Sequence, residues 1–201
     1  MTGRFVVLEG GDGSGKSTQC VALVEHLRAR GVEVVATVEP GSTPLGAALR
    51  RLLLDGDPVS PRAEALMMAA DRAEHVAEVI RPALARGAWV VSDRHVPSSL
   101  VYQGVVRGLG VAAVAALSAF AIDGLVPDLV ILLDVDDATA ETRRSGESDR
   151  LEREGAEFHA RVRAAYRDLA RTHGWTVVDA SGAVEAVADA VVAAVVPLLE
   201  P

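Results

Sequence analysis

The chain has 201 residues, of which 50% are hydrophobic and 24% charged, and its formal charge is −8. This composition supports one buried core and excludes a disordered protein, and the single cysteine excludes an intrachain disulfide. The longest uncharged stretch, residues 108–122, is too short to span a bilayer, and the first residues lack the apolar segment of a signal peptide. We therefore expect one domain over residues 1–201, located in the cytoplasm, without membrane contact; the acidic balance argues against a nucleic-acid partner.

Short apolar runs alternate along the chain with segments of helical periodicity. In chain order we predict a strand at 4–8, a helix at 16–30, a strand at 32–38, helices at 45–54 and 62–86, a strand at 89–92, helices at 98–107 and 110–124, a strand at 130–133, a helix ending near 172, a strand at 175–178 and a helix at 184–199. Pro82 should bend or restart the third of these helices. Strands separated by long helices pair in parallel, and uninterrupted apolar strands fit a sheet covered on both faces. The sequence predicts a three-layer α/β fold with a five-stranded parallel sheet.

A glycine-rich turn, GGDGSGKS at residues 10–17, joins the first predicted strand to the first predicted helix and matches G-x-x-x-x-G-K-[ST]. Glycines let backbone N–H groups converge on a phosphate, and the start of the helix adds positive potential. We expect Lys16 to reach the β- and γ-phosphates of ATP, and Ser17 to bind Mg²⁺ with Asp93 holding a water of the same ion. The ATP-binding residues predicted here are Gly10, Gly11, Asp12, Gly13, Ser14, Gly15, Lys16, Ser17 and Thr18.

Two counts narrow the class of phosphate-loop protein. The chain contains no Asn, so it cannot carry the N-K-x-D motif with which GTPase switches read guanine. A transport or motor ATPase would usually bring larger domains. Lys16 is the only lysine, and it stands where a compact point charge serves better than the planar guanidinium of Arg. A small nucleotide or metabolite kinase remains, and it needs a second anion-binding pocket.

The predicted loops after the second and third strands offer that pocket, because ligands bind at the carboxyl ends of parallel strands. Glu39 and Pro40 follow the second strand, and Asp93 and Arg94 end the third. Three arginines are candidates to bind a phosphate or a base edge through two hydrogen bonds from the planar guanidinium group: Arg72, Arg94 and Arg107. None of the five histidines has the spacing of a metal site, so we interpret them as non-ligands.

Five segments together resemble the thymidylate kinase family: GGDGSGKS, EPGST, MMAADRAEH, DRHVPSSLVYQG and DRLEREGAEFHARVRAAY. They run nearly from end to end of the chain. The resemblance implies a phosphate-loop NTPase fold with a short lid at about 142–157, transfer of the γ-phosphate of ATP to dTMP, and a homodimer. The nearly uncharged predicted helix 110–124 fits either a subunit interface or deep burial.

The same resemblance implies individual roles. Asp12 would lie near the acceptor sugar and phosphate, Arg94 would hold the acceptor phosphate, and Arg72 would hydrogen-bond the pyrimidine. Tyr102 would lie against the sugar and disfavour a 2′-hydroxyl. The remaining acceptor-site residues would be Glu39, Pro40, Met68, Ser98, Ser99 and Gln103. In the lid, Arg144 would bind ATP and Arg150 would act on the transferred phosphate, with Arg153 in the same segment.

The chain departs from the family pattern at four positions on the acceptor side: Val38 replaces an Arg, Ser42 a Gly, Met68 an aromatic residue and His95 a common Tyr. Aromatic stacking on a base is worth about 1–3 kcal/mol, so Met68 weakens pyrimidine binding unless its thioether compensates. These departures leave two alternatives open: a kinase for another or modified pyrimidine nucleoside monophosphate, and, more remotely, a non-catalytic nucleotide-binding regulator.

Overall fold

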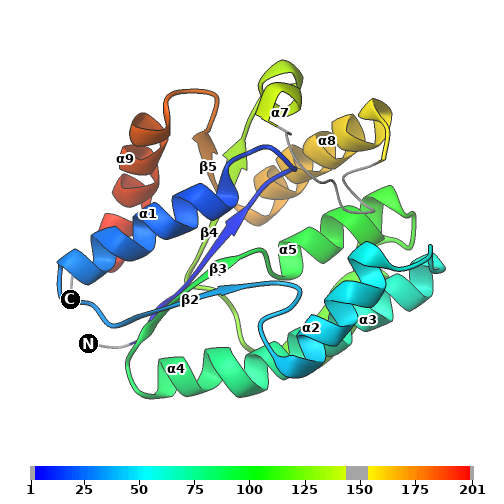
Figure 1. Ribbon diagram of the computed structural model, residues 1–201, viewed down its shortest axis with the longest axis horizontal. Coiled ribbons are helices and arrows are strands. Elements are labelled where there is room, and N and C mark those ends of the chain that lie inside the picture. Colours follow the sequence, from blue (N-terminus) through cyan, green and yellow to red (C-terminus); the bar gives the residue numbers. More distant parts are fainter. Residues whose placement is uncertain (1–2, 144–153, 200–201) are drawn as a thin grey trace.

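The computed structural model describes residues 3–143 and 154–199 (Figure 1). Five parallel strands form one sheet in the order β2-β3-β1-β4-β5. They are β1 (Phe5–Glu9), β2 (Val34–Val38), β3 (Trp89–Asp93), β4 (Leu129–Asp134) and β5 (Thr176–Asp179). β1 lies at the centre, where Val6 pairs with Val91 on one side and Leu129 on the other. The prediction of a five-stranded parallel sheet is confirmed.

Both faces of the sheet are covered by helices, as the uninterrupted apolar strands predict. Successive side chains of a strand point to opposite faces. Val6 and Leu8 pack in the core formed with α1 (Lys16–Ala29) and α9 (Val184–Val195), whereas Phe5 and Val7 pack on the opposite face with α4 (Arg81–Ala85). Figure 1 shows α1 and α9 on one side of the sheet and α4 on the other. Farther along the second face, Leu132 contacts a cluster that includes α8 (Ala156–His173).

Several predicted helices are interrupted by wider, π-helical turns. The predicted helix 62–86 consists of α3 (Pro61–His75), a π-helical turn at Val76–Ile80, and α4, which restarts beside Pro82 as expected. The predicted helices 45–54 and 98–107 divide in the same way. They are α2 (Pro44–Arg50) with a π-helical turn at Arg51–Asp55, and α5 (Val96–Ser99) with one at Leu100–Val106. Such turns gather at functional sites, and the last one carries Tyr102 and Gln103.

Two further helices bear on the sequence prediction, one of them unexpected. α7 (Asp137–Arg143) was not predicted at all. α6 (Val111–Ile122) exists as expected, but deep burial was the wrong alternative, because Phe120 is 87% exposed. Within the part of the chain that is described, no helix combines the length and apolarity needed to cross a bilayer.

Candidate active site

A cleft of about 340 Å³ opens at the carboxyl edge of the sheet, between the phosphate loop, the loop after β2, α3 and the α5 region. The parallel strands all end at this edge, so the loops after β1, β2 and β3 meet there. Its lining includes Asp12, Gly13, Gly15, Lys16, Ser17 and Thr18 of the phosphate loop, together with all nine predicted acceptor residues, Glu39, Pro40, Met68, Arg72, Arg94, Ser98, Ser99, Tyr102 and Gln103. The structure therefore brings these six predicted donor residues and all of the predicted acceptor residues into one cavity, whereas Gly10, Gly11 and Ser14 do not line it.

The phosphate loop takes a shape that only glycine accommodates at two positions. Gly13 and Gly15 have φ angles of 82° and 85°, and a Cβ on Gly13 would lie 2.4 Å from the carbonyl oxygen of Ala140. α1 begins at Lys16, whose Nζ donates a hydrogen bond to the Gly11 carbonyl at 3.0 Å. Burial and the nearby Arg94 lower the pKa of Lys16. The single lysine of the chain is thus held inside the loop.

Ser17 and Asp93 meet at the start of α1 and the end of β3. The Ser17 hydroxyl donates to Oδ2 of Asp93 at 2.6 Å. Oδ1 of Asp93 is buried and has no hydrogen-bond partner among the described residues. Hydroxyl and carboxylate oxygens are the ligands that hard divalent cations prefer. These two side chains therefore fit a divalent metal ion, held by Ser17 and, through water, by Asp93.

Asp12 lies where the two halves of the cleft meet. Nη2 of Arg94 donates to its Oδ1 at 2.6 Å, and the Tyr102 hydroxyl donates to its Oδ2 at 3.3 Å. Burial opposes ionisation of Asp12, but Arg94 and Lys16 outweigh it and lower the pKa. Arg94 adopts a φ of 74°, a strained conformation for a residue with a side chain. Such strain is typical of positions where side-chain placement serves a function.

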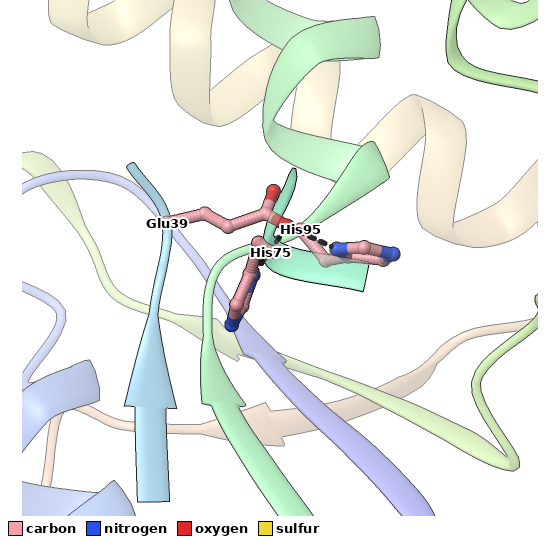
Figure 2. A group of neighbouring side chains, drawn as sticks. All are labelled: Glu39, His75 and His95. Carbon is pink, nitrogen blue, oxygen red and sulfur yellow. Dashed lines mark hydrogen bonds and ion pairs between the residues drawn. The ribbon is translucent and has the colours of Figure 1, made fainter. Parts of the chain in front are cut away.

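Glu39, which follows β2, is the centre of a buried hydrogen-bond hub, in which its carboxylate accepts from three side chains. Its Oε2 accepts from Nε of Arg72 at 2.9 Å. Its Oε1 accepts from Nδ1 of His75 at 2.8 Å and from Nδ1 of His95 at 2.7 Å (Figure 2). Burial opposes the charge of Glu39, but Arg72 and then His95 outweigh it and hold its pKa well below the ordinary value. The carboxylate is therefore ionised, and each imidazole donates its Nδ1 proton.

The Glu39, His75 and His95 ligand atoms lie within 4.8 Å of one another, a spacing that could suit a metal ion. The charges argue against it. Arg72 already neutralises Glu39, so a divalent cation would bring two uncompensated positive charges into a buried site. The cluster is better described as a hydrogen-bonded support for Arg72, whose Nη2 also donates to the His95 carbonyl at 3.2 Å and to Ser99 Oγ at 3.0 Å.

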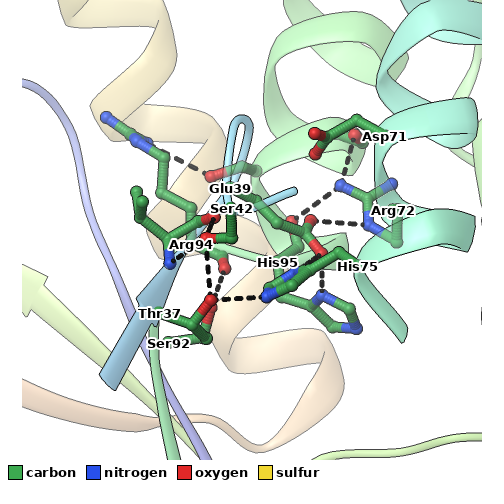
Figure 3. A network of polar contacts seen from close by, with 12 residues as sticks. Thr37, Glu39, Ser42, Asp71, Arg72, His75, Ser92, Arg94 and His95 are labelled. Atoms are coloured by element: carbon green, nitrogen blue, oxygen red, sulfur yellow. Dashed lines mark hydrogen bonds and ion pairs between the residues drawn. The ribbon is translucent and has the colours of Figure 1, made fainter. Parts of the chain in front are cut away.

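Figure 3 shows how this hub continues from Glu39 and His75 to Thr37 and Ser42. Thr37 Oγ1 lies 2.6 Å from Nε2 of His75 and 2.8 Å from the hydroxyl of Ser42. Ser42 and His95, two of the departures from the family pattern, therefore connect to the same carboxylate. Sequence reasoning missed the role of His75, although its position three residues after Arg72 puts both on one helix face.

Some predicted residues lie elsewhere. Arg107 does not line the cleft; it pairs with Glu64 and Glu154 and lies over the ring of Phe158. Arg144, Arg150 and Arg153 lie outside the described residues, as does most of the predicted lid. Two lining residues were missed, Arg50 and Leu54. Tyr166 of α8 was missed as well: its hydroxyl donates to Glu9 at 2.9 Å and accepts from Arg94 at 3.1 Å. A distant helix position gives no local signal for such a contact.

A second hollow of about 340 Å³ lies on the other side of the phosphate loop. It is lined by loop and helix residues that include Ser14, Gln19, Arg143, Gly182 and Val184. Nη1 of Arg143 donates to the Ala180 carbonyl at 2.6 Å, and Nη2 donates to the Gly182 carbonyl at 3.0 Å. The structure thus fixes a cation beside the loop, one residue before Arg144 in the chain.

An ATP-dependent nucleoside monophosphate kinase is the class of protein that these features define: a parallel sheet, a phosphate loop after β1 and an acceptor cleft that contains arginines.

Comparison with known proteins identifies one family within this class. A family model described as thymidylate kinase matches residues 8–191. Thymidylate kinases from Leifsonia xyli subsp. xyli and Clavibacter sepedonicus are 54% and 50% identical to the chain, covering 92% and 94% of it and 91% and 92% of their own lengths. That of Bifidobacterium longum strain DJO10A is 48% identical, covering 93% of the chain and 94% of its own length. The chain belongs to the thymidylate kinase family.

Phosphorylation of dTMP by ATP is the reaction that these matches support. They do not favour a kinase for another or modified pyrimidine nucleotide, nor a non-catalytic regulator. Val38, Met68 and His95 nevertheless line the cleft. These departures from the family pattern are therefore variations inside a thymidylate kinase site.

Asp71, next to Arg72 on α3, supports the loop after β2. Its Oδ1 accepts a hydrogen bond from the backbone N–H of Gly41 at 3.0 Å. Burial, followed by the nearby charge of Glu39, raises its pKa to about 6. The folded protein therefore holds this proton more tightly than the unfolded chain, where Asp titrates near about 3.9.

The stability that Asp71 contributes is present below the unfolded pKa and is lost as the pH rises through the folded value of about 6. Asp71→Asn has no proton to lose. We expect its free energy of unfolding, relative to the original chain, to rise between about pH 4 and pH 6 and then to level off. Urea unfolding at a series of pH values measures this difference, with Asp57→Asn, at an exposed position, as the control. A difference that stays constant with pH would contradict the assignment.

Proposed function

We propose that the cleft binds dTMP and that its residues transfer the γ-phosphoryl group of ATP to the dTMP phosphate. One observation carries the proposal. The positive charges of Lys16, in the phosphate loop, and of Arg94, on the acceptor side, both lower the pKa of Asp12. Nη2 of Arg94 lies 2.6 Å from Oδ1 of Asp12. The cations that would hold the donor and acceptor phosphates therefore converge on one point, which is where transfer requires them.

The chemistry at this point consists of positioning and charge compensation. The acceptor phosphate oxygen is already largely ionised, so no strong base is needed. Backbone N–H groups of residues 10–18 and Nζ of Lys16 would bind the donor phosphates, and Arg94 would align the acceptor phosphate for in-line attack. Mg²⁺, held by Ser17 and through water by Asp93, would offset phosphate charge when bound. Asp12 orients Arg94, and Arg150 of the lid stays a predicted contributor.

The rest of the cleft fits a pyrimidine deoxynucleoside. Arg72 would donate to a base carbonyl, with Ser98, Ser99 and Gln103 along the same wall. Tyr102 would face the sugar, since its hydroxyl already reaches Asp12. On the donor side, the hollow lined in part by Arg143 would hold the nucleoside of ATP. Arg144, the predicted ATP-binding residue, follows Arg143 in the chain.

Replacing Lys16 tests the assigned donor site. Lys16→Ala should lower kcat by at least about a hundredfold, because the compact charge on the transferred phosphate is lost. Turnover of dTMP with Mg-ATP, followed through ADP formation, measures the effect, and circular dichroism checks the fold. Near-normal turnover in a folded variant would refute the site.

Met68 lines the cleft where the family usually has an aromatic ring. Ring stacking on a base exceeds a thioether contact by roughly 1 kcal/mol. We therefore expect Met68→Phe to raise kcat/KM for dTMP about fivefold while the KM for ATP stays unchanged. An unchanged kcat/KM for dTMP would show that Met68 already supports the base as well as a ring does.

A homodimer formed through α6 is part of the proposal. Phe120 is 87% exposed, and Ala112, Ala113, Ala116 and Ala119 of the same helix are exposed as well. Contiguous exposed apolar surface of this kind marks interaction sites. The expected cytoplasmic location stays a prediction.

The dimer is tested by its mass. Sedimentation should give twice the chain mass of 21.0 kDa for the original protein and the single-chain mass for Phe120→Glu, because the charge cannot be buried between two copies. Val21→Glu, at an exposed position of α1, is the control. A single-chain mass for the original protein would disprove this surface as an interface.

A further inference from the structure

We infer that Glu64, a buried carboxylate outside the cleft, is a positioning residue that fixes the amide of Gln103 and thereby selects pyrimidines that carry an N3–H group. The inference rests on the proposed function, in which Gln103 lines the base pocket. It adds a residue that the sequence analysis did not single out and that does not line the cleft.

The geometry joins two buried side chains from different elements. Glu64 lies in α3, Gln103 lies in the π-helical turn after α5, and each is only 1% exposed. Nε2 of Gln103 donates to Oε1 of Glu64 at 2.9 Å. Arg107 Nε lies 3.4 Å from the same oxygen, which places a cation beside the carboxylate. An ionised carboxylate can only accept hydrogen bonds.

This contact determines which way the amide of Gln103 points. The nitrogen and oxygen lie at opposite corners of a planar group, so with Nε2 held by Glu64, Oε1 is turned away from it. The reversed orientation would set the amide oxygen against a carboxylate oxygen, two acceptors without a shared proton. Gln103 lines the cleft, and Oε1 has no hydrogen-bond partner in the ranges that are described. An acceptor is therefore available to a ligand.

Arg72 supplies the complementary donor. Its Nε is engaged by Glu39 and its Nη2 by His95 and Ser99, so that across residues 3–143 and 154–199 Nη1 is the nitrogen left for a ligand. A pyrimidine with a carbonyl at position 4 and N3–H beside it matches a donor next to an acceptor. Cytosine presents an amino donor and an N3 acceptor at the same places. Because unpaired polar groups in a buried site penalise binding, the pocket rejects the amino base.

The test compares two acceptors that share the 5-methyl group, dTMP and 5-methyl-dCMP. Glu64→Gln keeps the side-chain shape but can either accept from or donate to Gln103, so the amide loses its fixed orientation. We expect the ratio of kcat/KM values, dTMP over 5-methyl-dCMP, to fall at least about tenfold. Most of the change should come from the KM for dTMP, and the KM for ATP should stay within about twofold.

Arg107→Gln is the matched control, because it removes a cation that pairs with Glu64 and leaves the contact with Gln103 in place. Its ratio should stay within about twofold of the original. An unchanged ratio in Glu64→Gln, or an equal fall in both variants, would overturn the inference. Failure of the proposed function is a separate result: the original protein would then not phosphorylate dTMP, or Lys16→Ala would remain active.

A measurement on the unaltered protein covers the case in which Glu64→Gln does not fold. The side-chain amide of Gln103, assigned by NMR with Gln103→Met, should exchange its hydrogens at least about tenfold more slowly than a free glutamine amide, because one proton is donated to a buried carboxylate. Exchange at the free rate would overturn the inference.

Discussion

The acceptor side of this kinase depends on one buried ion pair, that of Glu39 and Arg72. It joins the residue that follows β2 to the last turn of α3, and through the histidines it also reaches the residues that follow β3. Breaking a buried pair by removing one partner typically costs about 3–5 kcal/mol, because the remaining charge is left uncompensated. The guanidinium of Arg72 is therefore compensated and held in place only while Glu39 stays ionised, and the interactions that keep the pKa of Glu39 low maintain that condition.

The departures from the family pattern make physical sense in this context. Ser42 and His95 do not act separately, since both are linked to Glu39, one through Thr37 and His75 and the other directly. Val38 leaves the edge of the cleft without the usual Arg, but Arg50 of α2 lines the same cleft, and its Nη1 donates to the Pro40 carbonyl at 2.8 Å. The acceptor side is thus a connected variation on the family's site, which agrees with the identity to thymidylate kinases along most of the chain.

Features that depend on neighbouring residues in the sequence could be predicted from it. Features that depend on contacts between residues far apart in the sequence could not. The phosphate loop, the five strands and the order of most helices follow from local patterns, and Asp12, Arg72, Arg94 and Gln103 came from motifs attached to them. The hydrogen bonds of Glu64 with Gln103 and of Tyr166 with Glu9 join residues 39 and 157 positions apart, and no spacing rule connects them. α7 was missed although Asp136 caps it by accepting from the Thr139 N–H at 2.8 Å. The capping pattern covers only a few residues, and the charged residues around it hid the short helix that it begins.

The burial of Lys16 has a consequence for the surface as a whole. Nineteen of the twenty cationic side chains are arginines, whose guanidinium groups do not react as amines. The one side-chain amine is 7% exposed and lies inside the phosphate loop. Reagents that acylate primary amines therefore meet a single side chain in the folded molecule, and a bound triphosphate would cover it. Covalent labelling of the Lys16 side chain, read separately from that of the backbone α-amine, is thus a direct report on whether the donor site is filled.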